Sequence, residues 1–507
     1  MNITTREKAS VSRQVRLTPS RYRNPIGKYK IIRSSACIGC GKCAELCPYG
    51  VHERLGESGK MIRPKDYRCH GFDCSGNDYF CIDKCPVNAL SIKVNPTYNG
   101  LGDFRWTNDM LISTWDQAEN GRIVNSSLES YIGNSGGGFD KLRFRFPDNP
   151  DKIIDKSQVD MSLKLNRRND DKETYDIKID VPWYGGGMSF GSISENTMEA
   201  KARVASAWNT FTCTGEGGYP QILYPYDDHV ITQVATGLFG VMEETIARVK
   251  FVEFKYAQGA KPGLGGHLLG DKNTPDVARM RQAVVGTSLF SPFPFHSVYS
   301  IEDHKKHVDW IKSINPKALI SAKVSTPSDV DMVAVGCYYA GVNIVHIDGS
   351  YGGTGAAPNI AKKNIAMPIE YAIPKVHEFL MNEGIRDNIT LIASGGIRNA
   401  QDIAKAIALG ADGCVIGTSE LVALECIRCG NCESGRGCAR GIATTDGELK
   451  KKIDLEYATQ RLINLYNSYY NQIVDILVRL GLSSIAELRG RTDLMYHIDY
   501  SNDVAVV

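Results

Sequence analysis

Residues 342–355 read Val-Asn-Ile-Val-His-Ile-Asp-Gly-Ser-Tyr-Gly-Gly-Thr-Gly. A short β-branched run that ends in a glycine-rich loop predicts a buried parallel strand followed by a tight backbone turn. Similar runs alternate with helical patterns from about residue 175 onward, which indicates repeated βα units. We therefore expect a parallel α/β fold for most of the chain.

Eight candidate strands support one particular α/β architecture. They lie at 181–188, 211–215, 251–257, 288–291, 318–324, 342–349, 389–394 and 413–417. Eight such units fit a (β/α)8 TIM barrel, which we place at residues 175–425. A doubly wound sheet would alternate in the same way, but no G-x-G-x-x-G opens a helix after the first strand. We therefore expect a barrel without a dinucleotide site.

Composition narrows the classes of protein further. Lys and Arg number 59 and Asp and Glu 57 in 507 residues, a net charge of +2 that argues against a general nucleic-acid binder. No apolar run approaches the roughly 20 residues of a membrane span, so no membrane association is expected. Residues 1–30 hold eight Arg or Lys without an apolar stretch, and we interpret them as a basic arm rather than a secretory signal.

The fifteen cysteines are unevenly distributed. Eight lie between Cys37 and Cys85 and four between Cys426 and Cys438. A disulfide scaffold would be small and secreted, whereas dense cysteine pairs in a large chain indicate metal in a reducing compartment. We therefore expect a cytoplasmic protein. The isolated Cys213, Cys337 and Cys414 lie in or next to apolar stretches and are expected to be core residues.

The first cysteine group reads C-x2-C-x2-C-x3-C-P, the spacing of bacterial ferredoxins, and a looser second set also ends in Cys-Pro. Residues 31–98 thus resemble an α+β two-cluster [4Fe–4S] ferredoxin domain. By the crossover rule of such domains, the ligands would be Cys37, Cys40, Cys43 and Cys85 for one cluster and Cys47, Cys69, Cys74 and Cys81 for the other. A pair of zinc sites is the alternative, since zinc ligands share the C-x2-C spacing.

Glycine loops follow the last three expected strands, where a barrel keeps its active site. Bare backbone amides in such loops can approach a phosphate closely, although the glycines could also serve only as turns. The candidates are Gly352, Gly353, Thr354, Gly395, Gly396, Gly417 and Thr418. Lys323 ends the fifth strand; it could be an ion-paired core residue, or beside a flavin it would stabilise negative charge on the reduced ring.

Several longer stretches resemble the synthase domain of the glutamate synthase family. They are residues 187–194 (Gly-Met-Ser-Phe-Gly-Ser-Ile-Ser), 214–218 (Thr-Gly-Glu-Gly-Gly), 257–263 (Ala-Gln-Gly-Ala-Lys-Pro-Gly), Ser291-Pro292-x-Pro294, 299–303 and 352–356. The fused ferredoxin segment is similar to the archaeal type. The resemblance implies an FMN-binding barrel that reduces 2-iminoglutarate, formed from 2-oxoglutarate and ammonia, to L-glutamate.

The same resemblance assigns roles within the pocket. Lys261 and Arg281 would bind the substrate carboxylates, as cations suit a dicarboxylate. Met188 and Ser189 are further expected substrate contacts, and the expected catalytic residues are Lys323, Glu216 and Gln258. Two positions depart from the family: Leu264 replaces the usual Glu and His267 the usual Gln, which bears on substrate contacts.

A third cysteine group, within residues 426–445, follows the eighth strand. Its members are Cys426, Cys429, Cys432 and Cys438. Related enzymes hold a [3Fe–4S] cluster here with three cysteines; the additional Cys429 favours [4Fe–4S], and zinc is the alternative. Since the group begins eight residues after Thr418, we expect electrons to pass from the front clusters through this one to FMN.

The remaining expectations concern flanking segments and partners. Residues 99–174 are predicted to be a helical lead-in and 446–507 C-terminal helices. The chain begins Met1-Asn2-Ile3 rather than with a nucleophilic cysteine, so the barrel is expected to take ammonia directly or from a separate glutaminase subunit. The electron donor would be ferredoxin or an NADPH-oxidising subunit, in a homo-oligomer or hetero-complex. The alternatives are a related FMN-dependent amine-glutamate synthase, such as an N-methylglutamate synthase-like subunit, and a non-catalytic electron-transfer subunit.

Overall fold

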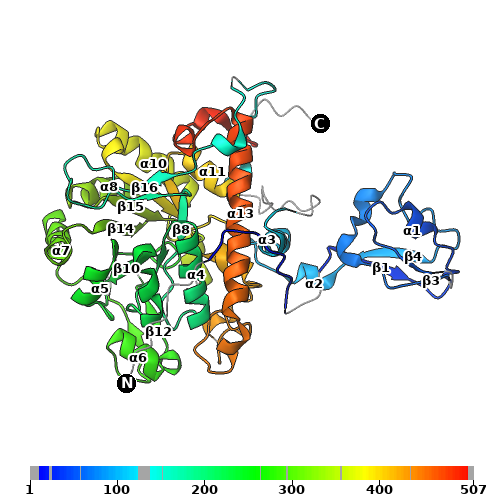
Figure 1. Ribbon diagram of the computed structural model, residues 1–507, viewed down its shortest axis with the longest axis horizontal. Helices are drawn as coiled ribbons and strands as arrows, with labels where there is room; N and C mark the ends of the chain where they lie inside the picture. The colour runs from blue at the N-terminus through cyan, green and yellow to red at the C-terminus, as the bar shows by residue number, and fades with distance from the viewer. Residues whose placement is uncertain are drawn as a thin grey trace.

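The computed structural model of the chain shows a large α/β body with a small domain standing out from one side (Figure 1). It describes residues 11–21, 26–56, 59–123, 138–150, 152–262, 264–292, 295–353, 355, 357–433 and 435–500. Much of the expected basic arm, residues 1–10 and 22–25, lies outside the described residues. No helix in these ranges is long and apolar enough to cross a membrane.

The large body is a TIM barrel, as the sequence predicted. Its eight strands form one parallel sheet: β8 (Trp183–Gly185), β9 (Thr212–Cys213), β10 (Val230–Ala235), β11 (Phe251–Lys255), β14 (Leu319–Ser325), β15 (Ile344–Asp348), β16 (Thr390–Ser394) and β17 (Gly413–Ile416). β8 pairs with β17, and the Gly185 N–H donates to the Phe211 carbonyl at 2.8 Å. This bond joins the two ends of the sheet and closes the barrel.

Helices surround the strands (Figure 1). They are α4 (Glu195–Ala207), α5 (Glu243–Arg248), α6 (Pro275–Arg281), α7 (Ile301–Ile314), α8 (Val330–Tyr339), α9 (Asn359–Asn364), α10 (Ile369–Asn382), α11 (Ala400–Ala408) and α12 (Thr418–Ala423). Side chains cap several of them: Ser300 accepts from the Asp303 N–H and Asn399 from the Asp402 N–H. The long C-terminal helix α13 (Leu455–Leu480) packs on α3 (Asn108–Asn120), α4 and α11.

One expected barrel strand is wrong. Residues 288–291 contribute β13 (Leu289–Phe290), which pairs antiparallel with β12 (His267–Leu268) outside the barrel. Its Phe290 is 66% exposed, which a barrel strand between two covered faces does not allow. The strand missing from the expectation is β10, whose six residues are all buried. Strands five to eight keep their expected order, so Lys323 does lie on the fifth.

Side chains fill the barrel in tiers, because alternate residues of each strand point inward. The floor is apolar and includes Tyr184, Ile231, Phe251, Leu319, Ile344 and Ile392. Two residues further along the strands, the tier is polar: Gln233, Glu253, Ser321, His346 and Ser394, all buried. The mouth then carries Lys255, Lys323 and Asp348. Polarity therefore increases toward the carboxyl ends of the strands.

The small domain has β1 (Tyr29–Arg33) antiparallel to β4 (Leu90–Val94), with α1 (Lys42–Leu46) and the hairpin β2 (Arg54–Leu55) and β3 (Lys60–Met61) between them. The segment that follows was expected to be helical, which is only partly right. It begins with α2 (Pro96–Asn99) and α3, but then contributes β5 (Leu142–Phe144), paired with β18 (Met495–His497), and β6 (Leu163–Lys164), paired with β7 (Lys178–Ile179).

A buried ion cluster attaches this lead-in to the barrel. The guanidinium of Arg398, which follows β16, is fully buried. Its Nε lies 2.7 Å from Asp402 of α11, and its Nη1 donates to Asp140 at 3.0 Å. Removing the cation would leave two buried carboxylates without their main partner, which is far more costly than losing a surface pair.

We predict that Arg398→Met lowers the stability of the protein by about 3–5 kcal/mol. The fall should be visible as a lower midpoint of thermal unfolding at a fixed scan rate. Arg279→Met is the matched control, because Arg279 and its partner Asp276 are exposed neighbours on α6. Equal midpoints for the two variants would show that the buried cluster does not hold the lead-in.

Candidate functional site

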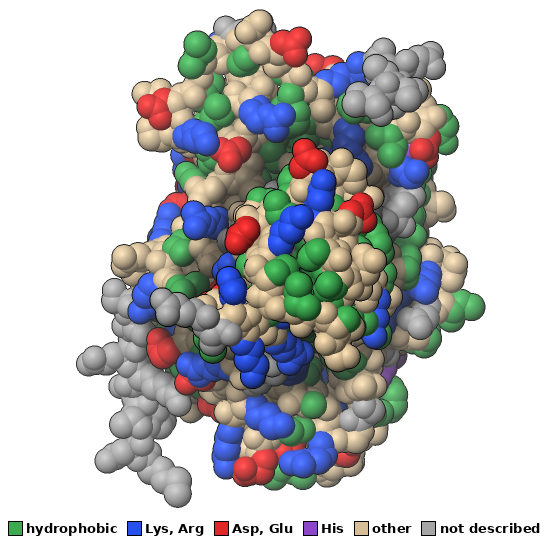
Figure 2. Space-filling model, turned by 90° about the vertical axis from the view of Figure 1, so that its right-hand side faces the viewer, with side chains coloured by type: hydrophobic (Ala, Val, Ile, Leu, Met, Phe, Trp, Pro, Cys, Tyr) green, Lys and Arg blue, Asp and Glu red, His purple; other side chains and the backbone are tan. Residues whose placement is uncertain are grey.

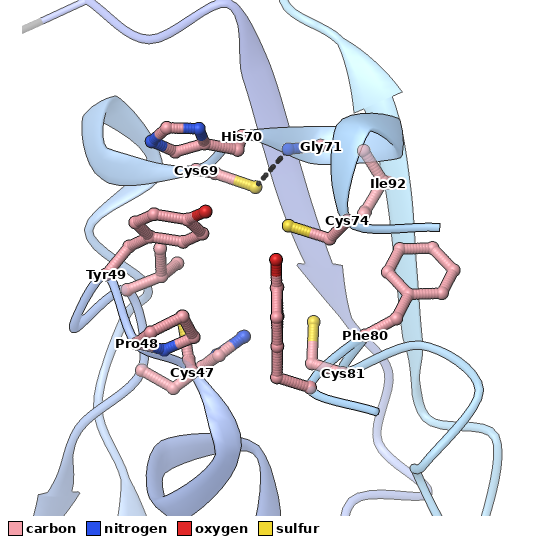
Figure 3. Close-up of a pocket in the computed structure, with 13 residues that line it drawn as sticks. Cys47, Pro48, Tyr49, Cys69, His70, Gly71, Cys74, Phe80, Cys81 and Ile92 are labelled. Carbon is pink, nitrogen blue, oxygen red and sulfur yellow. Dashed lines mark hydrogen bonds between the residues drawn. The ribbon is translucent and has the colours of Figure 1, made fainter. Parts of the chain in front are cut away.

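Four cysteines of the small domain surround one cavity. Its lining includes Cys47, Cys69, Cys74 and Cys81, the set expected for the second cluster. Figure 3 shows the sulfurs of Cys69, Cys74 and Cys81 directed into this space. The Gly71 N–H donates to Cys69 Sγ at 3.3 Å, the kind of contact that tunes a bound cluster.

The other four cysteines of this domain are less enclosed. Cys40 is exposed, whereas Cys37, Cys43 and Cys85 are half-buried. The Ala89 N–H donates to Cys85 Sγ at 3.2 Å. Burial opposes ionisation of Cys85, but the backbone N–H groups around it outweigh burial and lower its pKa. In the cavity, burial raises the pKa of Cys69 to about 11 and of Cys81 to about 12.

The donor set fits a cluster better than single metal ions. Tetrahedral zinc needs its sulfurs at about 2.3 Å from one point. Sulfurs arranged around a cavity instead suit a cubane, whose iron atoms each take one thiolate.

The third cysteine group lies against the mouth of the barrel. Cys426, Cys432 and Cys438 are half-buried, and Cys429 is exposed. The Arg428 N–H donates to Cys426 Sγ at 3.4 Å. Gly355, in the loop after β15, packs so tightly on Cys432 that a Cβ at residue 355 would lie 2.6 Å from Cys432 Cβ. The loop expected to bind phosphate therefore touches a cysteine expected to bind iron.

The segment that connects the two domains contacts the same junction; we call residues 95–107 the connecting strap. Arg428 pairs with Asp103 of the strap at 2.8 Å, and the Phe104 ring meets Tyr351 edge-on at 5.6 Å. Tyr98 and Trp106 of the strap belong to the apolar cluster that packs on Cys426. The strap thus links the small domain physically to the third cysteine group and to the loop after β15.

Three glycine loops meet at the barrel mouth. Gly353 lies so close to Thr418 that a Cβ on the glycine would be 2.1 Å from Thr418 Oγ1, and Gly395 and Gly396 have φ of +87° and +91°. Met188 Cε lies 3.4 Å from the Cβ position of Gly417. Thr354 and the motif residues Gly263 and Pro294 lie outside the described residues.

The residues at these loops fit a flavin phosphate. Ser350 is fully buried, and its Oγ has no hydrogen-bond partner among the described residues. Such an orphaned hydroxyl is costly unless a ligand satisfies it. The Arg105 guanidinium stacks over Tyr351 of the same loop at 4.6 Å from the ring centroid. Backbone amides, a free hydroxyl and a nearby cation are the donors that a phosphate needs.

Lys323 lies below these loops, 3.4 Å from Asp348. Burial would lower its pKa, but the Asp348 and Glu253 carboxylates outweigh burial and raise it. The lysine is therefore a buried ammonium. Both interpretations from the sequence describe it in part: it is ion-paired, and it lies at the barrel mouth, where a flavin would sit.

Beside the loops, a second cavity gathers charged residues. Its lining includes Glu216, Lys255, Gln258 and Lys261, three of which the sequence singled out. Lys255 Nζ lies 3.1 Å from Glu216 Oε2. Burial would raise the pKa of Glu216, but Lys255, Lys261 and Arg281 together lower it. Burial lowers the pKa of Lys261, partly offset by Glu216.

Arg281 approaches the same cavity from α6. Its Nη2 donates to Ser189 Oγ at 2.9 Å, and its Nε has no partner among the described residues. The side chain is only 4% exposed. A buried guanidinium with an unused donor is ready to bind a carboxylate. The structure thus brings Met188, Ser189, Lys261 and Arg281 to one side of the barrel mouth.

The two departures from the family pattern lie in different surroundings. Leu264 is 55% exposed. His267 lies between Lys261 Nζ, 3.4 Å from its Nδ1, and Glu433 Oε2, 3.2 Å from its Nε2. Glu433 follows Cys432 in the chain, so His267 connects the charged cavity with the third cysteine group.

Sequence reasoning missed Lys255, which is 9% exposed and pairs with Glu216. The signal was present: Lys255 is a charged residue at the end of an apolar strand, and register places it beside Lys323. The polar tier with Glu253 and His346 was also missed. Single charged residues within otherwise apolar strands could have revealed it.

A family model for the conserved region in glutamate synthase matches residues 139–483, and a 4Fe–4S binding domain model matches residues 30–51. The chain belongs to the glutamate synthase family. It is 38% identical over 479 residues to the archaeal-type glutamate synthase (NADPH) of Dehalococcoides mccartyi, covering 90% of this chain and 92% of that protein. It is 36% identical to the archaeal enzyme of Methanocaldococcus jannaschii, covering 92% and 94%.

These relatives make the chain an oxidoreductase of the archaeal glutamate synthase type. The glutamate synthase (NADPH) large chain of Azospirillum brasilense is 36% identical over 321 residues, which cover 62% of this chain but 21% of that protein. Among solved structures, the flavin-binding domain of baker's yeast flavocytochrome b2 is only loosely similar, at a TM-score of 0.44 and 16% identity over 79% of this chain and 80% of that one.

We predict that Gly353→Ala loses most of its bound FMN, since a methyl group there must push Thr418 aside and open the loops. Flavin content of the purified protein, read from its absorbance, should fall at least about tenfold, the effect of roughly 1.4 kcal/mol. Gly447→Ala is the matched control, because a Cβ at residue 447 meets nothing within 4 Å. Full flavin content in Gly353→Ala would remove this loop from the cofactor site.

Proposed function

We propose that the chain reduces 2-iminoglutarate, formed from 2-oxoglutarate and ammonia, to L-glutamate. The observation that carries this proposal is the charged cavity beside the glycine loops. It offers Lys255, Lys261 and Arg281 within reach of one small molecule. A five-carbon dicarboxylate needs cations for both of its ends, and guanidinium supplies a two-pronged contact.

FMN, held by Gly352, Gly353, Thr354, Gly395, Gly396, Gly417 and Thr418, would supply hydride chemistry when bound. The chain's own residues would do the rest. Arg281 and Lys261 would hold the two carboxylates, with Met188 and Ser189 positioning the carbon chain against the flavin loops. Gln258 would orient the nitrogen of the substrate, and Glu216, kept ionised by its cationic neighbours, would stabilise an iminium.

Electrons would enter through the small domain. We propose two [4Fe–4S] clusters there, with the ligand sets that the cysteine spacing predicted. Figure 2, which looks onto this domain, shows hydrophobic side chains gathered on its outer face. The exposed hydrophobic residues of the domain include Ile38, Leu55 and Phe72. An apolar face beside the exposed Cys40 would suit a donor protein that docks transiently.

A third cluster would lie on Cys426, Cys432 and Cys438, with Cys429 as the fourth ligand of a [4Fe–4S] rather than a [3Fe–4S] cluster. The close contact between Cys432 and Gly355 supports a short path for electrons from this cluster to FMN. The donor would be reduced ferredoxin or a subunit that oxidises NADPH. Ammonia would come from a separate glutaminase subunit, in the cytoplasm, where thiolate ligands stay reduced.

The direct test is an anaerobic assay of the purified chain with reduced viologen, 2-oxoglutarate and ammonium. We expect one L-glutamate for every two electrons consumed, detected by chromatography. Consumption of electrons without glutamate would overturn the proposal. Product formed only when methylamine replaces ammonium would favour the related amine-glutamate synthase instead.

We predict that Lys261→Ala and Arg281→Ala each raise the KM for 2-oxoglutarate while FMN stays bound. Loss of one charge-assisted contact costs about 1.5–3 kcal/mol, or roughly 10- to 150-fold. Lys305→Ala, which removes an exposed α7 lysine paired with Asp309, is the control. If both pocket variants keep wild-type kinetics, these cations do not bind the substrate.

Iron content tests the cluster assignment. We predict about 12 iron atoms per chain after anaerobic purification, four for each of three cubanes. Cys429→Ser should lower this number to about 11 and produce the EPR signal of an oxidised three-iron cluster. Cys337→Ser, a half-buried cysteine of α8 outside the three groups, should keep the wild-type content. A wild-type value near eight would rule out the third cluster.

A further inference from the structure

One tier of side chains inside the barrel is polar and charged although it is buried, which is unusual for a barrel interior. TIM-barrel interiors are dominated by Val, Ile and Leu, and buried polar groups destabilise a core unless each is satisfied. Here the tier holds Glu253 and His346, exposed by 2% and 1%. Neither residue lines the charged cavity described above. Their position directly beneath the mouth suggests a task that an apolar layer could not perform.

Hydrogen bonds join this tier into one chain that ends at the mouth. Gln233 Nε2 donates to Glu253 Oε1 at 2.8 Å, and Glu253 Oε2 lies 2.8 Å from His346 Nδ1. His346 Nε2 lies 2.7 Å from Ser394 Oγ. Ser394 Oγ in turn donates to Asp348 Oδ1 at 2.7 Å, and Asp348 Oδ2 faces Lys323 Nζ at 3.4 Å. The chain joins five neighbouring strands, β10, β11, β14, β15 and β16.

The directions of these bonds fix the protons on His346. A serine hydroxyl has one proton, and Ser394 gives it to Asp348, so His346 Nε2 must donate to Ser394. Both oxygens of Glu253 face donors, Gln233 Nε2 at 2.8 Å and Ser321 Oγ at 3.4 Å, as suits an ionised carboxylate that only accepts, so His346 Nδ1 donates as well. Both ring nitrogens therefore carry protons. We infer that His346 is an imidazolium and the positioning residue that keeps Lys323 directed at the bound flavin.

The charges around His346 balance in this assignment. Burial would raise the pKa of Glu253, but His346 and Lys323 outweigh burial and lower it; Asp348 behaves in the same way. The other titratable groups that face this network, Tyr184 and Cys213, stay neutral because burial raises the pKa of both. Lys201, near Cys213, is already paired with Glu420 at 3.0 Å. The carboxylates of Glu253 and Asp348 then balance two cations. These are the imidazolium of His346 and the ammonium of Lys323.

The consequence for Lys323 follows from how Asp348 is satisfied. Asp348 accepts from Ser394 through Oδ1 and from the Gly259 N–H, at 3.0 Å, through Oδ2. It therefore does not depend on Lys323 alone. Without the imidazolium, Ser394 could turn its proton away, and Asp348 would draw the lysine ammonium toward itself. The positive charge available to a reduced flavin would fall, and the flavin midpoint potential with it. This step rests on the proposed function.

The test combines two readouts on the full-length holoenzyme. NMR of protein labelled with ¹⁵N-histidine gives the protonation state of His346, assigned by the signal that His346→Gln loses. Spectroelectrochemistry gives the flavin midpoint potential of His346→Gln and Ser394→Ala. Ser321→Ala is the matched control, since Ser321 lies in the same tier and contacts Glu253 only at 3.4 Å, off the chain to Lys323.

We expect both ring nitrogens of wild-type His346 to carry protons in spectra recorded near pH 7.5. The potential of both chain variants should become more negative by at least about 30 mV, a tenfold change for a two-electron couple, with little change in Ser321→Ala. A neutral His346 near pH 7.5, or unchanged potentials in folded variants, would overturn the inference.

If His346→Gln does not fold, the flavin midpoint potential of Ser394→Ala and the NMR spectrum of the histidine-labelled wild type still test the inference. The NMR readout does not require flavin. A protein that contains no FMN but shows a doubly protonated His346 would therefore contradict the proposed function and leave the assignment of the imidazolium intact.

Discussion

The loop after β15 lies directly on the third cysteine group, and most of the site depends on this contact. A side chain at Gly355 could not be accommodated beside Cys432. On the other side of the same loop, Gly353 meets Thr418, the first residue of α12. Two glycines of one loop thus lie against the two proposed sites, Gly355 beside the iron cluster and Gly353 beside the flavin phosphate. The connecting strap also contacts this junction: Asp103 pairs with Arg428, and the Phe104 ring packs edge-on against Tyr351.

Electrostatics at the barrel mouth complements this geometry. Lys255 and Lys323, which are neighbours in register, each have a carboxylate partner, Glu216 and Asp348. Burial would lower the pKa of Lys323, but Asp348 and Glu253 outweigh burial, and both lysines are positioned where a negatively charged substrate or cofactor would bind. Paired charges of this kind stabilise the protein less than an apolar core would. They are more readily explained by ligand binding than by stability.

Much of the architecture could be predicted from the sequence, for identifiable reasons. The barrel follows from strands that are buried on both sides and therefore read as continuous apolar runs, and the ferredoxin-like segment follows from cysteine spacing. The fourth expected strand was wrong because residues 288–291 are too short for periodicity to distinguish a barrel strand from an exposed hairpin. The strand at β10 was missed, although its six residues are buried.

The site was predictable to the extent that its residues lie within recognisable motifs. Lys261, Glu216 and Gln258 meet in one cavity, and Arg281 approaches it from α6. Lys255 and the His346 chain could not be inferred from motifs, since their roles depend on which residues of neighbouring strands share a tier. The link from Lys261 through His267 to Glu433 spans more than 160 residues of sequence and is visible only after folding.

The central claim is that the third cysteine group delivers electrons to the flavin across the loop after β15. The most direct measurement is anaerobic stopped-flow absorbance of flavin reduction by reduced ferredoxin, in the wild type and in Cys432→Ser. We predict that the variant retains FMN, and that dithionite still reduces it, but that reduction by ferredoxin is lost. Flavin reduction in Cys432→Ser at the wild-type rate would contradict the account and make the third group structural.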